Sequence, residues 1–122
     1  FCQATLDETS TWDHARHIST SLLEAGAKNV LVTFGSHGLM AATRDEKVLV
    51  HAPATLRIVD TCGAGATFSA AYIWTILMGG TLQEAAVFAT AAGSVKCLNQ
   101  GLITILSDEI WVIADDLVVE IE

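Results

Sequence analysis

The glycines of residues 60–68 form the part of the sequence whose residue types and spacing are best suited to chemistry. The segment reads Asp-Thr-Cys-Gly-Ala-Gly-Ala-Thr-Phe, and it is expected to follow a short strand and to open a helix. At such a junction the unpaired backbone N–H groups of Gly63, Ala64 and Gly65 converge at the positive end of the helix dipole. Because a glycine has no side chain to hold a phosphoryl oxygen away from the backbone, the turn predicts an anion-binding site.

The same turn also has a plainer interpretation. A Gly-x-Gly turn before a helix is often only a tight connection between two elements. The sequence also lacks GxxxxGK[ST], the pattern of the lysine-bearing phosphate loop. Taken alone, the glycines leave both interpretations open.

The cysteines favour a reducing compartment. Cys2, Cys62 and Cys97 are odd in number and show no CxxC spacing, which argues against a disulfide framework or a zinc site. We therefore expect a cytoplasmic protein. Cys62 has no basic residue beside it in the sequence. Cys62 and Cys97 are both predicted to be small buried groups and not nucleophiles.

Two histidines and three tryptophans are further side chains that a ligand could use. His14 and His17 lie three residues apart on an expected helix, but no third metal ligand stands near them, so we expect solvated histidines. Trp12, Trp74 and Trp111 sit within helical apolar patterns and are predicted to anchor the core.

Composition limits the possible classes of partner. The chain has 122 residues, 52% of them hydrophobic, with 6 Lys and Arg against 14 Asp and Glu and a formal net charge of −8. This length suits a single domain over 1–122. Six scattered bases cannot capture nucleic acid or an anionic membrane, and no apolar run reaches the roughly 18 residues that span a bilayer. Because the sequence begins at Phe1 without a Met, we expect a fragment or a processed product.

Hydrophobic spacing predicts the elements that position the glycine turn. A capping pattern at Ser10 opens the first helix, and Thr81 with Glu84 forms a capping box for a later one. The expected helices cover residues 10–25, 68–78, 82–98 and a last segment from 107. The expected strands cover residues 29–34, 39–42, 47–51 and 57–59. The strands 39–42 and 47–51 are predicted to form an antiparallel hairpin, the 68–78 helix to be buried, and residues 117–122 are left unassigned.

This alternation of helices with short apolar strands predicts an α/β layer fold with a mainly parallel sheet. Residues 60–68 resemble the C-terminal signature of the ribokinase (PfkB) family of sugar and nucleoside kinases. Residues 29–38 resemble that family's Thr-x-Gly-x-x-Gly nucleotide-binding strand and turn. Three later segments fall in the family's order and approximate spacing: 81–86, 88–92 and 99–101. The resemblance covers about residues 9–110.

The resemblance implies a truncated three-layer α/β/α ribokinase-like fold that holds the phosphates of ATP or ADP, with Mg²⁺, over Gly63, Ala64 and Gly65. It also implies which residues line the nucleotide groove: Thr33, Gly35, Ser36, Gly38, Gly65 and Thr90. Backbone carbonyls near the signature hold a monovalent cation, such as K⁺, in the family. The matching positions here are Asp60, Cys62, Asn99 and Gly101.

One departure from the family concerns the catalytic base. The family signature ends Gly-Ala-Gly-Asp, and its aspartate accepts the proton of the attacking sugar hydroxyl, whereas this chain has Ala66. Losing a positioned general base costs about 10² to 10⁴ in rate. Phosphoryl transfer depends mainly on positioning and charge stabilisation, so nucleotide binding can survive the loss. The resemblance therefore implies a kinase domain with weak or absent phosphotransfer. Asp60 is a less favoured substitute base, because its register suggests that it braces the loop.

A second departure concerns the substrate. The N-terminal portion that carries most sugar-contacting residues in the family has no counterpart in this sequence. Such a truncation leaves apolar surface uncovered, which favours self-association as a homodimer or pairing with a missing N-terminal half. The alternative function is accordingly a non-catalytic interaction or dimerisation module on a degenerate kinase scaffold.

Overall fold

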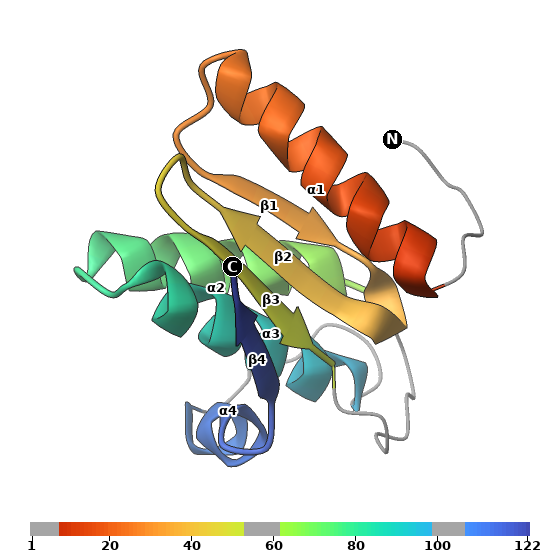
Figure 1. The fold of residues 1–122 in the computed structure, drawn as a ribbon. Helices are drawn as coiled ribbons and strands as arrows, with labels where there is room; N and C mark the ends of the chain where they lie inside the picture. Colours follow the sequence, from red (N-terminus) through yellow and green to blue (C-terminus); the bar gives the residue numbers. More distant parts are fainter. Residues whose placement is uncertain (1–7, 53–61, 99–106) are drawn as a thin grey trace.

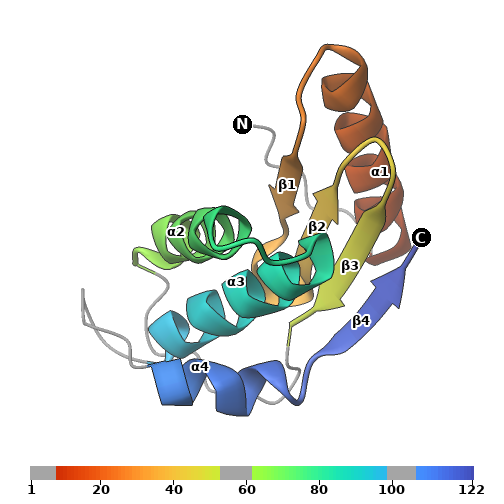
Figure 2. The same cartoon turned by 90° about the vertical axis from the view of Figure 1, so that its left-hand side faces the viewer.

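A computed structural model describes residues 8–52, 62–98 and 107–122 of the chain. Its elements, in chain order, are α1 (Glu8–Glu24), β1 (Val30–Thr33), the 3-10 helix η1 (Gly35–His37), β2 (Gly38–Ala42), β3 (Lys47–His51), α2 (Ala64–Leu77), α3 (Leu82–Cys97), α4 (Ser107–Ala114) and β4 (Val118–Ile121). Figure 1 shows α1 on one face of the sheet and the other helices on the opposite face. Figure 2 shows the sheet between these two layers, so the expected three-layer α/β/α class is confirmed.

The described strands form one antiparallel sheet in the order β1-β2-β3-β4. The predicted hairpin of β2 with β3 is confirmed. The predicted mainly parallel direction is wrong for these four strands. A parallel pair needs a crossover of a dozen or more residues, whereas only η1 separates β1 from β2 and a four-residue turn separates β2 from β3. The expected strand at 57–59 lies outside the described residues.

The alternation of side chains along the strands builds two cores. Leu39 and Val50 face α2 and α3, in a core that continues through the alanines of α3. Met40 and Leu49 face the other way and pack against Trp12 of α1. Because successive residues of a strand point to opposite faces, two adjacent apolar residues in one strand serve both helical layers.

The first helix begins earlier than its predicted cap. α1 starts at Glu8, so Ser10 lies inside the helix and does not precede it. The C-terminal end is as predicted: Gly26 adopts a φ of 110°, and the amide of Ala27 donates to the carbonyl of Leu22 at 3.0 Å. This is the arrangement in which a glycine in a left-handed conformation ends a helix.

α2 and α3 approach each other so closely at Gly93 that a side chain at this position has no room. A Cβ built on Gly93 would meet the ring of Phe68, including its Cζ at 2.6 Å. The predicted capping box of α3 is confirmed, since the amide of Glu84 donates to the Thr81 hydroxyl at 3.1 Å and the amide of Thr81 donates to the Glu84 carboxylate at 2.7 Å.

Two predictions of burial are wrong. α2 carries apolar residues all round, yet only Ala71, Tyr72 and Thr75 are buried, and its opposite face is exposed. Among the tryptophans only Trp12 is buried, whereas Trp74 and Trp111 are about half exposed. Helical spacing identifies an apolar stripe but not whether another element covers it. Within the described residues, no helix is long and apolar enough to cross a membrane.

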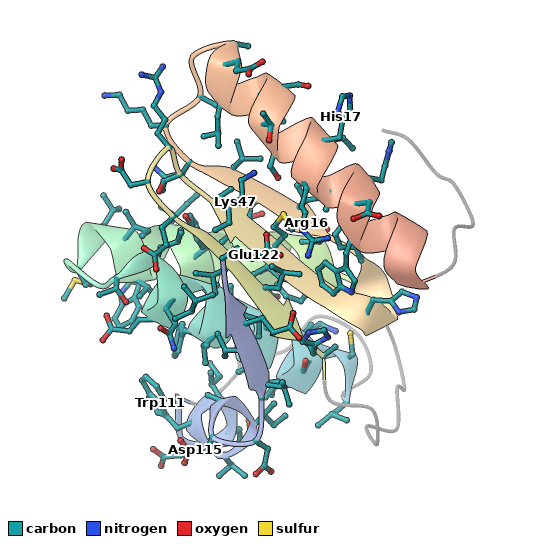
Figure 3. All side chains as sticks on the ribbon, viewed as in Figure 1. Arg16, His17, Lys47, Trp111, Asp115 and Glu122 are labelled. Atoms are coloured by element: carbon teal, nitrogen blue, oxygen red, sulfur yellow. The ribbon has the colours of Figure 1, made fainter. Side chains whose placement is uncertain are left out.

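The last strand is an element that the sequence left unassigned. β4 pairs with β3, and the amide of Glu122 donates to the carbonyl of Lys47 at 2.8 Å. The Glu122 carboxylate accepts from Nε of Arg16 on α1 at 2.9 Å. Figure 3 shows Arg16, Lys47 and Glu122 gathered at this point, where the middle of α1 meets the C-terminal end of the chain.

Candidate functional site

The N-terminus of α2 is the best-formed candidate site. Its N-cap is Gly63, which adopts a left-handed conformation with a φ of 78°, and no side chain caps the helix. Its first turn also contains no acidic residue, in contrast to α3, which has Glu84 there. The first N–H groups of a helix have no partner within it. Those at the start of α2 therefore remain available to an anion.

The space in front of these amides is open. A Cβ built on Gly65 would meet no atom within 4 Å, and the same is true of Gly35 in η1. Gly65 and Ala66 are both exposed. Ala66 contributes only a methyl group, which can neither accept a proton nor repel a phosphate. The structure thus leaves open space beside Gly65, and the side chain of Ala66 offers no base.

Two contacts fix α2 in this place. The hydroxyl of Tyr72 donates to the Asn29 side chain at 3.1 Å, which ties the middle of α2 to the residue before β1. Burial raises the pKa of the Tyr72 hydroxyl, so it stays protonated and keeps donating. The ring of Phe68, one turn into α2, packs against Gly93 of α3. Figure 1 shows the result: α2 begins at the end of the sheet where β1 ends and η1 lies.

The predicted nucleotide residues divide into accessible and buried ones. Thr33 and Gly35 are exposed, and Ser36 lies with Gly35 in η1. Gly38 is buried, and a Cβ there would collide with the carbonyl of Val50, so its glycine serves the packing of two strands. Thr90 is 0% exposed and its hydroxyl donates to a carbonyl within α3 at 2.8 Å. The structure therefore brings Thr33 and η1 to the same end of the sheet as the glycine turn, and places Gly38 and Thr90 inside the fold.

Most of the predicted cation positions cannot be placed. Asp60, Asn99 and Gly101 lie outside the described residues. Cys62 is described and is exposed, so the prediction that it is buried is wrong. In the described ranges no three His, Cys, Asp or Glu side chains gather as a metal site.

Sequence reasoning missed two features with chemical potential. Lys96, in the last turn of α3, is only 2% exposed, and its apolar neighbours in the sequence give no hint of a buried ammonium group. A cavity of about 380 Å³ lies between the C-terminal half of α1 and the β2–β3 turn. Its lining residues are Thr20, Leu23, Glu24, Thr43, Arg44 and Lys47. Only the folded chain brings these two segments together, so no local sequence signal could have shown the cavity.

Comparison with known proteins identifies the family. The profile of the pfkB family carbohydrate kinases matches residues 3–109. The chain belongs to this family. The match includes both motifs singled out in the sequence, residues 29–38 and 60–68. It therefore confirms the resemblance predicted from those motifs.

Individual pfkB family members agree with this assignment. The chain is 37% identical to a deoxyribokinase of Salmonella typhi over 76 residues. These residues make up 62% of this chain and 24% of the deoxyribokinase. It is 33% identical over 102 residues to a ribokinase of Arabidopsis thaliana, 82% of this chain and 27% of the relative. A crystal structure of phosphofructokinase-2 from Escherichia coli in complex with potassium superposes with a TM-score of 0.79 and 28% identity, over 85% of this chain and 34% of that one. The chain thus spans about a quarter of the length of these curated pfkB relatives.

Proposed function

We propose that this chain is the nucleotide-binding part of a sugar or nucleoside kinase and that it binds ATP or ADP at the N-terminus of α2. The observation that carries the proposal is the N-terminus of α2, which no side chain of the described residues caps. The space that a side chain at Gly65 would occupy is open. Backbone amides of Gly63, Ala64 and Gly65 would donate to phosphate oxygens, and Thr33 with the η1 turn would line the nucleotide from the end of β1.

Metal ions in this proposal come mainly with the ligand. The described part of the chain offers no carboxylate cluster, so Mg²⁺ would be held by the nucleotide phosphates and water, where it neutralises phosphate charge. The potassium found with the Escherichia coli relative supports a monovalent cation near the backbone of Cys62, with Asp60, Asn99 and Gly101 as the other positions. We propose a cytoplasmic protein, because the cysteines lack any disulfide or zinc spacing.

The same proposal holds that phosphotransfer is weak or absent. Ala66 stands where the family signature has its proton acceptor, so the proposed site has no side-chain base at that position. A coupled assay with MgATP and ribose, fructose or nucleosides should show no turnover above background. Turnover at a rate typical of kinases would contradict the inactive part of the proposal and leave nucleotide binding standing.

Calorimetric titration with MgATP and MgADP tests the binding directly. The substitution Gly65→Ala should weaken binding at least about tenfold, because the added methyl group stands where a phosphate oxygen approaches. The matched control is Ala70→Gly, an exposed position of the same helix away from the turn, which should leave affinity unchanged. A flat titration of the unsubstituted chain at millimolar nucleotide would remove the proposal.

A second candidate function is an interaction module that has kept the kinase scaffold without its ligand. The exposed apolar face of α2 favours it, because such faces usually mark contact surfaces. Sedimentation analysis across a wide concentration range separates homodimerisation from other contacts. A monomer at every concentration would remove self-association as its mechanism.

A further inference from the structure

Three aromatic rings from three helices form a continuous band on the surface opposite α1. Phe88 of α3 lies between the other two, with ring centroids 5.5 Å from Trp74 of α2 and 5.4 Å from Trp111 of α4. Trp74 is 55% exposed and Trp111 is 54% exposed. Figure 2 shows α2, α3 and α4 side by side on this face, so the rings cross from one helix to the next. We call these three rings the aromatic band.

The aromatic band is widened by neighbouring apolar side chains. Further exposed apolar residues lie on the same helices and at the end of α2: Ile73, Leu77, Met78 and Val112. No charged residue occurs anywhere in residues 62–83. Leu77 and Met78 stand three and four residues after Trp74, which places them on its side of the helix. Exposed apolar surface built around aromatic side chains is typical of interaction sites in soluble proteins.

The charge around the aromatic band has one sign. Asp108 and Asp115 stand three residues before and four residues after Trp111, which places both on its side of α4, and both are exposed. Figure 3 shows Trp111 on α4 and, close to it, Asp115 just after the end of that helix. Asp116 adds another exposed acid at the end of the same helix.

The described bases lie elsewhere. Arg16 is on α1, Lys28 precedes β1, and Arg44 and Lys47 belong to the β2–β3 turn and the start of β3. Lys96 of α3 is buried. Among the described residues, no exposed base borders the aromatic band, so its electrostatic border is acidic.

We propose that the aromatic band is a docking surface for a separate polypeptide, whose bound segment is a helix with an apolar stripe bordered by lysine or arginine. The apolar stripe would cover Trp74, Phe88 and Trp111, and its bases would meet Asp108 and Asp115. Opposite charges at an interface border favour association and fix its register. A second copy of the same face would offer these acids no exposed base among the described residues, and an anionic membrane surface would be repelled.

The proposal does not depend on nucleotide binding, since the aromatic band excludes Gly63 and Gly65. For the interaction module given above as the second candidate function, the proposal adds only the chemistry of the partner. A helix in a groove or on an apolar face needs anchors at i, i+3, i+4 and i+7, and this requirement determines the design of the probe.

The probe is a synthetic amphipathic peptide of about 18 residues, or five helical turns, with leucine at the anchor positions and lysine beside them. Two comparison peptides carry glutamate for lysine, or serine for leucine, at the same positions. Fluorescence titration of the full chain should show the leucine–lysine peptide binding at least about tenfold more tightly than either comparison. Its binding should shift tryptophan emission to shorter wavelength, because Trp74 and Trp111 leave water while Trp12 is already buried.

Matched variants locate the binding surface. Trp111→Ser should weaken binding of the leucine–lysine peptide about tenfold and Asp115→Asn about threefold. Both positions are exposed, so circular dichroism should show an unchanged fold. The controls are Leu22→Ser on α1 and Asp45→Asn in the β2–β3 turn, which make the same kinds of change at exposed sites away from the aromatic band. They should keep the affinity within about twofold of the unsubstituted chain.

Three results would overturn the proposal. The first is a leucine–lysine peptide that binds no better than its glutamate counterpart, or does not bind. The second is an equal loss of affinity in the control variants, which would mean that general negative charge holds the peptide. The third is a concentration-dependent dimer that Trp111→Ser abolishes, which would make a second copy the occupant.

Discussion

At the residue scale, Ala66 separates the two steps that a kinase site combines. It is the third residue of α2, exposed, and in a first turn that holds no acid. Backbone amides at that turn can still receive a phosphate, because they depend on the helix end and on the glycines beside it. The proton acceptor is a side-chain property, and one methyl group removes it. In the proposed site, phosphate binding would depend on backbone amides and phosphotransfer on a side chain, so one turn would hold the two functions in different atoms.

Restoring the acid should first appear as a change in stability. Ala66→Asp places a negative charge at the positive end of an uncapped helix, which should raise the free energy of unfolding by about 0.3–1 kcal/mol at neutral pH. Urea unfolding at pH 7 and at pH 3 measures this, because protonation of the new carboxylate removes the gain. The control Ala66→Asn carries no charge. A gain that is equal for Asp and Asn would contradict the dipole explanation.

Gly38 is a second residue whose role differs from the one its motif suggests. Its φ of 123° is unfavourable for other residues, and a Cβ would collide with the carbonyl of Val50 and come within 2.9 Å of the Ala52 nitrogen. Gly38→Ala should therefore lower the free energy of unfolding by at least about 2 kcal/mol. Thermal melting of this variant beside Gly65→Ala provides the comparison, because Gly65 has open space and should not be destabilised. Equal losses in both variants would contradict this assignment.

At the scale of elements, the contact between α2 and α3 connects the core to the candidate site. Phe68 packs directly on Gly93 and belongs to the first turns of α2, whose amides face the open space. A displacement of Phe68 would therefore move the end of the helix that is proposed to bind phosphate. The alanines of α3 permit this close approach, because their methyl side chains extend only a short distance from the helix.

Gly93→Ala should destabilise the fold by about 1–3 kcal/mol through overpacking against Phe68. The variant Phe68→Leu removes ring atoms from the same contact, and combining the two should cost less than the sum of the single losses. Chemical unfolding of the four proteins gives the coupling energy. If the losses in the free energy of unfolding are additive, the methyl group added at position 93 does not clash with Phe68.

The elements also show how far local sequence reasoning reaches. Thr81 and Glu84 marked the start of α3, and the hairpin of β2 with β3 followed from two apolar runs, because these signals act over a few residues. The antiparallel order of the sheet and the strand β4 did not follow, since pairing is decided by partners distant in the chain. The exposure of Trp74 was missed for the same reason: a stripe of apolar residues does not say what covers it.

At the scale of the whole molecule, an ion pair joins the middle of α1 to the C-terminal residue of the chain. Arg16 on α1 donates through Nε and through Nη2 to the Glu122 carboxylate beyond β4, and Nη1 donates to Asp13 at 3.0 Å. The hydrogen bond from Arg16 is the main reason that the pKa of Glu122 is lowered from its ordinary value of 4.5, with a smaller contribution from Lys47. The pair links the outer helical layer to the edge of the sheet.

This ion pair predicts a pH dependence of stability. Because the folded state holds the carboxyl pKa below its unfolded value, the stabilisation is present above about pH 4.5 and is lost as the pH falls through the lowered pKa. Glu122→Gln should cost about 1 kcal/mol or less at pH 7, since both partners are about one-third exposed, and less at pH 3. Urea unfolding between these pH values measures it, with Asp45→Asn as the control. A loss independent of pH would assign the effect to backbone pairing.

The position of β4 has a consequence for the time course of folding. β1, β2 and β3 follow one another along the chain and pair with their neighbours, whereas β4 returns from the far end to reach β3. Closing near loops is faster than bringing distant segments together, so we expect the three-strand meander to be present at the rate-limiting barrier and β4 to dock afterwards. Loosening the Arg16–Glu122 contact should then hasten spontaneous unfolding while leaving the refolding rate almost unaltered.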